Sequence, residues 1–159
     1  MIERTLVLVK PDGVQRSLTG TVISKFENAG LKIVGMRMVW VNKSLSKKHY
    51  SDHIGKPFFP GLDEFIRSGP VIAMVLEGVE AIKNVRRIVG STAPAEATPG
   101  TIRGDYAHHS YAYADKKGKS IANIIHASGD AKDAKKEVAL WFDKKELHSY
   151  KRADEHIVF

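Results

Sequence analysis

The sequence predicts an α/β (α+β) sandwich of the ferredoxin-like, split βαβ kind, with helices around a four-stranded antiparallel sheet. Two observations predict it: four short apolar runs of β character, and amphipathic segments that alternate with them along the chain. The chain has 159 residues, a size at which one hydrophobic core is comfortable. We therefore expect a single domain over residues 1–159.

The first part of the chain is expected to form two strands and a helix. Residues 6–9 are a β-branched run closed by a Lys-Pro-Asp-Gly sequence at 10–13, typical of a buried strand that ends in a turn. Apolar residues at helical spacing predict a helix over residues 21–29, and Gly30 stands where such a helix would end. Residues 31–41 return to β character and predict the second strand.

The middle of the chain contains the most apolar segment. Residues 44–53 are typical of a capped polar helix, and residues 61–67 of a short helix with one apolar face. Residues 71–76 are apolar throughout, which predicts a central strand. A further helix is expected over residues 79–89.

A long stretch without periodicity lies between the last two expected helices, residues 79–89 and 130–142. Residues 91–118 contain prolines and few regularly spaced apolar residues, so they are expected to be irregular. A loop of this length inside a compact domain is usually functional. Residues 121–125 predict the fourth strand, and residues 130–142 the clearest amphipathic helix.

Composition limits the class of protein. The chain has 25 Lys and Arg against 18 Asp and Glu, a net charge of +7, which favours nucleotides, nucleic acid or acidic membranes as partners. It has no cysteine, which excludes disulfides, thiolate metal sites and cysteine nucleophiles. The charged first residues lack the apolar core of a signal peptide, and no apolar run reaches membrane-spanning length. We expect a cytoplasmic protein without a membrane partner.

Two basic residues are candidates for binding phosphate. Lys10 follows a strand directly, at the edge of the sheet where open α/β folds bind ligands, although it also fits an ordinary turn. On a helical wheel Arg86 falls inside the apolar arc of residues 79–89, where a guanidinium needs a partner. It equally fits an arginine that reaches solvent near a helix C-terminus.

Two further segments carry reactive side chains. In residues 98–105, glycines bracket Arg103 with hydroxyls nearby, which fits an anion-binding loop or a structural arginine–aspartate pair. His126 ends an apolar run, with Ser128 after it and Glu137 on the next helix. Such a histidine is a nucleophile or general base with an orienting carboxylate, or a structural residue of the core.

Taken together, these segments resemble the nucleoside diphosphate kinase family. The likeness runs through nearly the whole chain, and its motifs occur in the order of that family. They are Val9-Lys-Pro-Asp-Gly13, His49-Tyr50 with Phe58 and Leu62, Asn84-Val-Arg86 with Gly90 and Thr92, Pro99-Gly-Thr-Ile-Arg-Gly-Asp105, Asn123-Ile-Ile-His126-Ala-Ser128, and Glu137 to Phe142. Separate motifs in one order are far more specific than any one of them, so the functional interpretation of each becomes the expected one.

The resemblance implies a phosphotransferase that moves the γ-phosphoryl group of a nucleoside triphosphate to a nucleoside diphosphate by a ping-pong mechanism. It implies that His126 is the nucleophile, phosphorylated at Nδ1, and that Glu137 holds the other ring nitrogen and fixes the tautomer. Lys10 and Tyr50 are expected near the transferred group, and Ser128 is expected to support the histidine. A neutral imidazole is nucleophilic near pH 7, which agrees with this chemistry.

The same resemblance implies a set of nucleotide-binding residues. They are Lys10, Phe58, Leu62, Arg86, Thr92, Arg103, Asn123 and Ser128. Thr92 and the two arginines are expected to hold the phosphates, while Lys10 and Asn123 bind the ribose 3′ hydroxyl. The base is expected to stack on Phe58, with Leu62 beside it.

Cofactor and partners follow from the same likeness. Mg²⁺ is expected to arrive with the nucleotide, bound through phosphate oxygens and without an assigned protein ligand. Stacking does not depend on base identity, so ATP, GTP, GDP, CDP, UDP and their deoxy forms are expected substrates. The family also implies a homo-oligomer, a hexamer or a tetramer.

The chain departs from the family pattern in two places. It carries about ten additional residues between Arg103 and Asn123, which predicts a loop insertion within residues 106–120 at the rim of the nucleotide site. Gly129 also stands where many relatives have an aspartate near the metal, and Asp130 is a candidate to replace it. An alternative function is a basic module that binds nucleic acid or nucleotide without turnover; nucleic-acid binding by the enzyme itself would be secondary.

Overall fold

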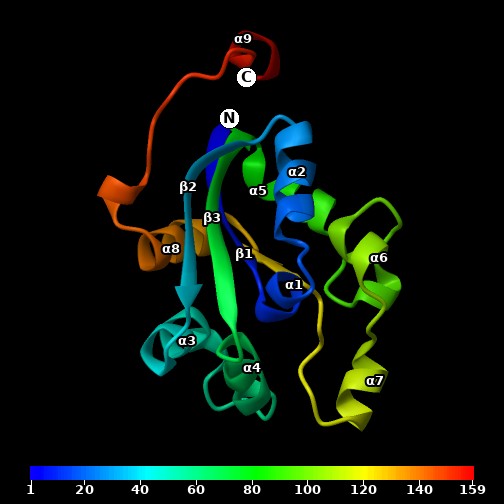
Figure 1. Ribbon diagram of the computed structural model, residues 1–159. Helices are drawn as coiled ribbons and strands as arrows, with labels where there is room; N and C mark the ends of the chain where they lie inside the picture. The colour runs from blue at the N-terminus through cyan, green and yellow to red at the C-terminus, as the bar shows by residue number, and fades with distance from the viewer.

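The computed structural model describes residues 1–159 and contains one four-stranded antiparallel sheet (Figure 1). The strands are β1 (Ile2–Val9), β2 (Lys32–Trp40), β3 (Pro70–Val79) and β4 (Ile125–Ala127), in the order β2-β3-β1-β4. Both inner strands are antiparallel to their neighbours. The expected α+β sandwich is thus confirmed, with β1 and β3 at its centre.

Side chains alternate between the two faces of the sheet, and each face buries its own apolar cluster. From β1, Val7 and Val9 face one cluster, whereas Leu6 and Leu8 face the other. Because successive residues of a strand point to opposite faces, one short run supplies both halves of the core. This explains why the predicted central strands are apolar at every position.

Helices cover both faces of the sheet. They are α1 (Pro11–Gln15), α2 (Thr19–Asn28), α3 (Lys43–His49), α4 (Phe59–Ile66), α5 (Ala81–Val89), α6 (Ile102–Tyr106), α7 (Tyr111–Lys116), α8 (Ala131–Trp141) and α9 (Glu155–Val158). Residues of α2 and α5 bury their apolar faces in the cluster of Val7 and Val9, and Trp141 of α8 packs in the cluster of Leu6 and Leu8. Figure 1 shows α2 and α5 on one side of the sheet and α8 on the other. No helix has both the length and the apolarity that crossing a bilayer requires.

The fourth strand lies further along the chain than expected. The prediction of a strand over residues 121–125 is wrong, since β4 comprises residues 125–127. Ile124 has a left-handed backbone with φ of 71°, which interrupts an extended conformation. The apolar run continues through this residue because Ile124 is buried in the core without being part of the sheet.

Short helices form in two places where the sequence predicts none. The turn expected after β1 is α1, with Pro11 at its first position, where the missing N–H costs nothing. The stretch 91–118 contains α6 and α7, each begun by a side chain that caps the helix: Thr101 accepts from Gly104 N–H, and Ser110 accepts from Tyr113 N–H. These helices are too short for a periodic pattern to reveal them.

Candidate active site

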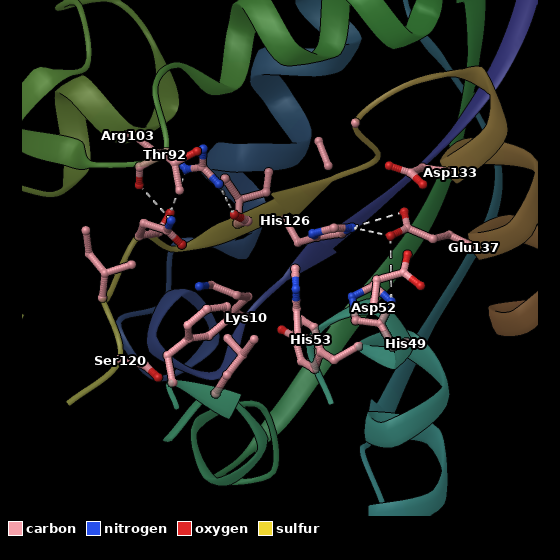
Figure 2. A pocket seen from close by; sticks show the side chains of 18 of the residues that line it. Lys10, His49, Asp52, His53, Thr92, Arg103, Ser120, His126, Asp133 and Glu137 are labelled. Atoms are coloured by element: carbon pink, nitrogen blue, oxygen red, sulfur yellow. Dashed lines mark hydrogen bonds and ion pairs between the residues drawn. The ribbon is translucent and has the colours of Figure 1, made fainter. Parts of the chain in front are cut away.

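A cavity of about 640 Å³ opens beside the end of β1, between the α3–α4 region, the insertion and α8 (Figure 2). Every residue predicted for the site lines this cavity except Ser128: Lys10, Tyr50, Phe58, Leu62, Arg86, Thr92, Arg103, Asn123, His126 and Glu137. They come from five helices and strands (α4, α5, α6, β4 and α8) and from the segments that connect them. The fold therefore gathers motifs that are far apart in sequence, and Ser128 lies behind Glu137, away from the cavity.

His126 and Glu137 form the best-defined pair in the cavity. His126 Nε2 lies 3.0 Å from each carboxylate oxygen of Glu137, and the two residues come from β4 and α8. Ser128 Oγ donates to Glu137 Oε2 at 2.6 Å and accepts from the buried Leu6 N–H at 3.3 Å. Ser128 thus connects Glu137 to the central strand. With Nε2 donating to the carboxylate, Nδ1 is the nitrogen with a free lone pair.

Burial alone would raise the pKa of Glu137. Hydrogen bonds from His126 and Ser128, together with the electrostatic effects of the two nearby histidine rings, outweigh that effect and hold the pKa below its usual value. Glu137 is therefore an anion at neutral pH. A fixed anion behind an imidazole keeps the proton on the nitrogen that faces it, and stabilises positive charge that develops on the ring.

The backbone before His126 is strained and held in place by β1 and α1. Ile124 has φ of 71°, an uncommon conformation for a β-branched residue. Its N–H donates to Asp12 Oδ2 at 2.8 Å, and its carbonyl accepts from Lys10 N–H at 2.8 Å. The Lys-Pro-Asp-Gly turn therefore fixes the chain directly ahead of the histidine, a role that its sequence does not reveal.

Lys10 lies buried at the end of β1, and it forms no ion pair. Its Nζ lies 4.9 Å from the centre of the Phe65 ring, which is a cation–π contact. Burial lowers the pKa of Lys10 to about 8; Asp12 partly opposes this shift and Arg103 adds to it. An ammonium group without a carboxylate partner, facing a cavity, is suited to bind a phosphate oxygen.

Arg103 is buried and anchored to backbone. Its Nε, Nη1 and Nη2 donate to the carbonyls of Asn123, Gly90 and Ile125 at 3.3, 3.1 and 2.7 Å. Burial and the charge of Arg86 lower its pKa to about 10, so it stays a cation at neutral pH. This arginine therefore connects α6 to the loop before His126, and it also presents positive charge to the cavity.

The remaining predicted phosphate and ribose ligands surround Arg103. Arg86 on α5 is exposed, as expected of an arginine that reaches solvent. It also lines the cavity, as expected of an arginine that binds a ligand. Asn123 Nδ2 donates to the Thr92 carbonyl at 2.8 Å, while its buried Oδ1 has no hydrogen-bond partner. A buried acceptor without a partner, facing a cavity, is a place for a ligand hydroxyl.

The other end of the cavity is open and less polar. Phe58 is 54% exposed, and Leu62 lies beside it on α4. Several residues of the segment 106–120, where an insertion is predicted, also line this end: Tyr111, Ala114, Asp115, Lys119 and Ser120. A Cβ atom on Gly61 would lie 3.4 Å from Ser120 Oγ, so α4 and the end of the insertion are in contact.

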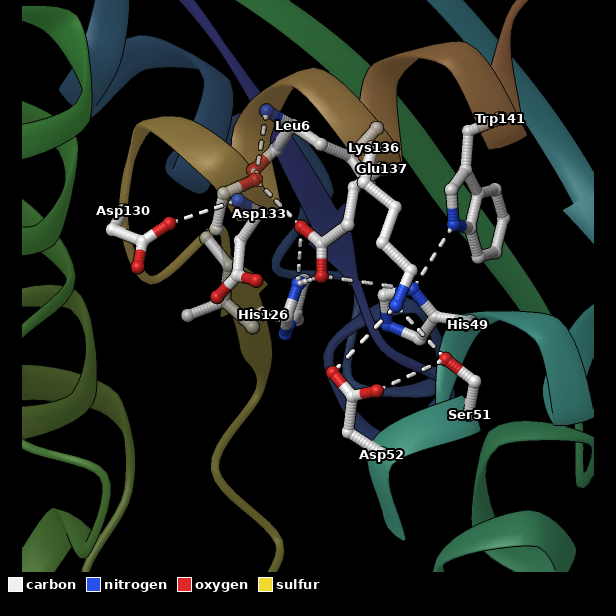
Figure 3. Close-up of polar contacts among 12 residues, drawn as sticks. Leu6, His49, Ser51, Asp52, His126, Asp130, Asp133, Lys136, Glu137 and Trp141 are labelled. Carbon is white, nitrogen blue, oxygen red and sulfur yellow. Dashed lines mark hydrogen bonds and ion pairs between the residues drawn. The ribbon is translucent and has the colours of Figure 1, made fainter. Parts of the chain in front are cut away.

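The structure adds residues to which the sequence analysis assigns no role, although His49 belongs to one of its motifs. His49 packs its ring against His126, with centroids 4.7 Å apart. Lys136 donates to Ser51 at 2.9 Å and lies 3.6 Å from Asp52, which connects α8 to the segment after α3 (Figure 3). The pattern of residues 130–142 signals only the apolar face of α8, and the functional side chains project from its other positions.

Two groups of side chains deserve comparison with metal sites. The ligand atoms of His49, His126 and Glu137 lie within 4.8 Å of one another. Glu137 and His126 Nε2 are already hydrogen-bond partners, and His49 Nδ1 accepts from Trp141, whereas His49 Nε2 is buried without a partner. Asp130, the candidate replacement for an aspartate at 129, caps α8 by accepting from Asp133 N–H at 2.8 Å. It does not line the cavity, whereas the carboxylate of Asp133 does.

Comparison with known proteins identifies close relatives. The family model for nucleoside diphosphate kinase matches residues 3–147. A nucleoside diphosphate kinase of Pyrococcus furiosus is 47% identical over 152 residues, which are 96% of this chain and 90% of that protein. The likeness extends over almost the full length of both.

Solved structures give the same result. A Borrelia burgdorferi nucleoside-diphosphate kinase, a transition-state mimic with bound vanadate and ADP, superposes with a TM-score of 0.95 at 46% identity, covering 99% of this chain and 96% of that one. A Halobacterium salinarum nucleoside diphosphate kinase in complex with CDP has a TM-score of 0.88 at 42% identity, covering 100% and 99%. The likeness to both structures therefore extends over almost the full length of each chain.

Proposed function

Because the chain belongs to the nucleoside diphosphate kinase family and has the activity of that family, we propose that His126 carries the phosphoryl group between two nucleotides. The observation that carries this proposal is the fixed pair of His126 Nε2 and Glu137, with Ser128 behind it. This arrangement leaves Nδ1 as the nucleophilic nitrogen on the wall of a large cavity.

The transfer takes place in two half-reactions. The Nδ1 lone pair attacks the γ-phosphorus, the new P–N bond forms, and the P–O bond to the leaving diphosphate breaks. A second nucleoside diphosphate then attacks the phosphohistidine through its terminal oxygen, and the P–N bond breaks. The ionised Glu137 favours both steps, since it stabilises the positive charge that His126 acquires while phosphorylated.

Phosphate binding is assigned to the cations of the cavity. Lys10, Arg86 and Arg103 bring positive charge to one region, and Thr92 adds a hydroxyl. In phosphoryl transfer most of the acceleration comes from positioning and charge neutralisation. The anchoring of Arg103 by three carbonyls supports this role, because its charge is held in place before a nucleotide binds.

Tyr50, Asn123 and the aromatic end of the cavity complete the substrate site. Burial raises the pKa of the Tyr50 hydroxyl, so it stays a neutral donor near the transferred group. The unpartnered Oδ1 of Asn123 is available to the ribose 3′ hydroxyl. Stacking on Phe58 beside Leu62 tolerates every base, which fits ATP, GTP, GDP, CDP, UDP and their deoxy forms as substrates.

Mg²⁺ is the cofactor we propose, because nucleotide kinases generally need a divalent cation. Mg²⁺ prefers oxygen ligands and keeps several waters. The nucleotide phosphates would therefore supply most of its remaining ligands, and the protein few. Among the cavity carboxylates, Glu137 is bound to His126 and Asp52 pairs with Lys136. Asp115 and Asp133 have no side-chain partner, but Asp115 lies at the open end of the cavity, whereas Asp133 is on α8, as Glu137 is. Asp133 is therefore the carboxylate of this chain that fits an outer position around the ion, whose chemistry is to neutralise phosphate charge.

We also propose a homo-oligomer, hexameric or tetrameric, built from single domains of residues 1–159 with an inserted loop at 106–120. The support is edge strand β2, where Met36, Met38 and Trp40 are 54%, 63% and 69% exposed. An exposed apolar edge strand is suited to pair with a second copy. Sedimentation equilibrium measures the assembly directly.

The net charge of +7 favours nucleic-acid binding as a secondary activity. The absence of cysteine favours a cytoplasmic location. A salt titration separates the two kinds of activity. Backbone binding to nucleic acid falls steeply with salt, whereas phosphoryl transfer does not depend on release of a counterion layer.

The experiment that tests the proposal uses the pure protein with Mg²⁺ and γ-labelled ATP and no acceptor. We expect protein-bound label that is acid-labile, base-stable and located on His126 by mass spectrometry. The label should move to added CDP or GDP. Nucleotide binding without any label on the protein would contradict the assignment of His126.

A further inference from the structure

His49 is a buried histidine in contact with the pair of His126 and Glu137. It ends α3, and its side chain is 1% exposed. Its ring lies nearly perpendicular to that of His126, at 82° with centroids 4.7 Å apart. Figure 2 shows it beneath His126 on the side of Glu137. The proposed reaction assigns no role to His49.

A hydrogen bond from the core defines the tautomer of His49. Trp141 Nε1–H donates to His49 Nδ1 at 3.2 Å (Figure 3), and an indole N–H can only donate. The lone pair of His49 is therefore on Nδ1, and its proton is on Nε2. Glu137 Oε1 is 3.8 Å from Nδ1, too far for a hydrogen bond, so His49 does not compete with His126 for the carboxylate.

The surroundings of His49 keep its ring uncharged. Burial lowers its pKa to about 3, and His126, His53 and Lys136 act in the same direction, while Glu137 opposes them. These groups come from β4, the segment after α3, and α8. A neutral ring next to His126 adds no repulsion when His126 becomes positively charged during transfer.

We propose that His49 is a positioning residue for phosphoryl transfer: held edge-on by Trp141, it limits the tilt of the His126 ring so that Nδ1 faces the incoming phosphorus. The inference rests on the proposed role of His126. The ring is attached at Cγ, and Glu137 holds it at Nε2 alone, so rotation about the Cβ–Cγ bond is the motion left to limit. His49 blocks this rotation on one side of the ring, and the other side is the cavity.

Trp141 helps to position His126 indirectly, because it holds His49. Trp141 is fully buried on the far side of His49, and their rings meet at 88° with centroids 5.5 Å apart. Its indole N–H would lack a partner if His49 turned away, and a buried unpaired donor costs free energy. Rotation of His49 is therefore opposed, and with it the loss of contact to His126.

The test compares three variants. His49→Gln keeps an acceptor for Trp141 but removes the rigid ring, Trp141→Phe keeps the ring but removes the hydrogen bond, and His156→Gln alters an exposed histidine on α9 as a control. Single-turnover phosphorylation by ATP gives the rate, titration with ADP gives the affinity, and ¹⁵N NMR of the imidazoles gives the tautomer of His126 without nucleotide.

We expect His49→Gln to slow phosphorylation at saturating ATP by about tenfold to a hundredfold, because small errors in alignment are costly in such transfers. ADP affinity should stay within about twofold, and the His126 signals should change from one tautomer to a mixture. Trp141→Phe should act in the same direction with a smaller effect, and His156→Gln should match the wild type.

A purely structural role for His49 gives a different outcome. Lower melting temperatures with unchanged phosphorylation rate and unchanged His126 tautomer would overturn the inference. If His49→Gln does not fold, Trp141→Phe alone decides through the same two readouts. Absence of phosphohistidine in the wild type would instead contradict the proposed function, so the two failures are distinguishable.

Discussion

The two ends of the cavity differ in how much is built before a nucleotide binds. At the His126 end, side chains are buried and bind each other or backbone: Glu137 is held by Ser128, and Arg103 by three carbonyls. At the base end, Phe58 is 54% exposed and Tyr111 is 49% exposed. The groups that align the reacting atoms are thus preorganised, whereas those that meet the base are not, so we expect rate to depend on one end and affinity on the other.

The sharpest test of this difference is removal of the nucleophile. His126→Ala should lower phosphoryl transfer by about 10⁴-fold or more, because no other side chain forms the covalent intermediate. Nucleotide affinity should change only a few-fold, since the cations remain. A coupled assay and titration calorimetry measure the two quantities. Turnover above about 1% of wild type in pure variant protein would assign the nucleophile elsewhere.

Glu137→Gln tests whether the anion matters beyond its hydrogen bond. Gln can still accept from His126 Nε2–H, but it lacks the charge that stabilises a phosphorylated imidazole. We expect kcat to fall by about 10²-fold with little change in KM. Since the pKa of Glu137 is held below its usual value, the loss should be equal at pH 6 and pH 9. Glu27→Gln, on the exposed face of α2, is the matched control.

The pH dependence of Lys10 sharpens the assignment of the phosphate-binding end. Its pKa is lowered to about 8, so it is a cation below this pH and becomes neutral above it. The charged form binds phosphate, hence kcat/KM should fall as pH rises, by about tenfold between pH 7 and pH 9. In Lys10→Arg the guanidinium stays charged, and the alkaline decline should disappear. A wild-type profile that is flat to pH 9 would show that this charge is not needed.

Sequence reasoning selects residues that the structure brings together at the preorganised end, because these residues occur in compact motifs. The Lys-Pro-Asp-Gly turn, the loop with Arg103 and the segment with His126 each combine a reactive residue with turn residues that position it. The secondary structure around these motifs is harder to predict from the sequence. The strand prediction fails at Ile124 because its buried apolar side chain is like that of a strand residue. Its backbone is left-handed, and its N–H donates to Asp12, so the strand is interrupted there.

Contacts across long separations account for what the sequence did not predict. The hydrogen bond between Trp141 and His49 joins residues that are 92 positions apart in the sequence. The sequence around either residue does not indicate that the other is its partner. Trp141 is equally well explained as a core residue of α8, which it also is. The helices α6 and α7 went unpredicted for a different reason, since their caps and not any apolar periodicity define them.

At the base end, Phe58→Ala should raise KM by about fivefold to tenfold for ATP, GTP and CDP alike, because stacking contributes about 1–3 kcal/mol with any base. The value of kcat should stay within about twofold, since Phe58 touches none of the groups around His126. Initial-rate kinetics with each nucleotide provide the comparison. A loss confined to one base, or a large fall in kcat, would break the proposed separation of the two ends.

Shortening the segment 106–120, the proposed insertion, gives the smallest expected effect. His109 anchors its start, since its Nδ1 accepts from Ala122 N–H at 3.2 Å and its carbonyl accepts from Ala95 N–H at 3.0 Å. Residues 110–119 can therefore be replaced by a short Gly-Ser linker while that anchor stays. Because the removed residues line only the open end of the cavity, we expect KM to change about threefold, unequally among bases, with kcat unaltered. Identical KM values for every nucleotide, with an unchanged melting temperature, would leave Phe58 and Leu62 as the whole of the base site.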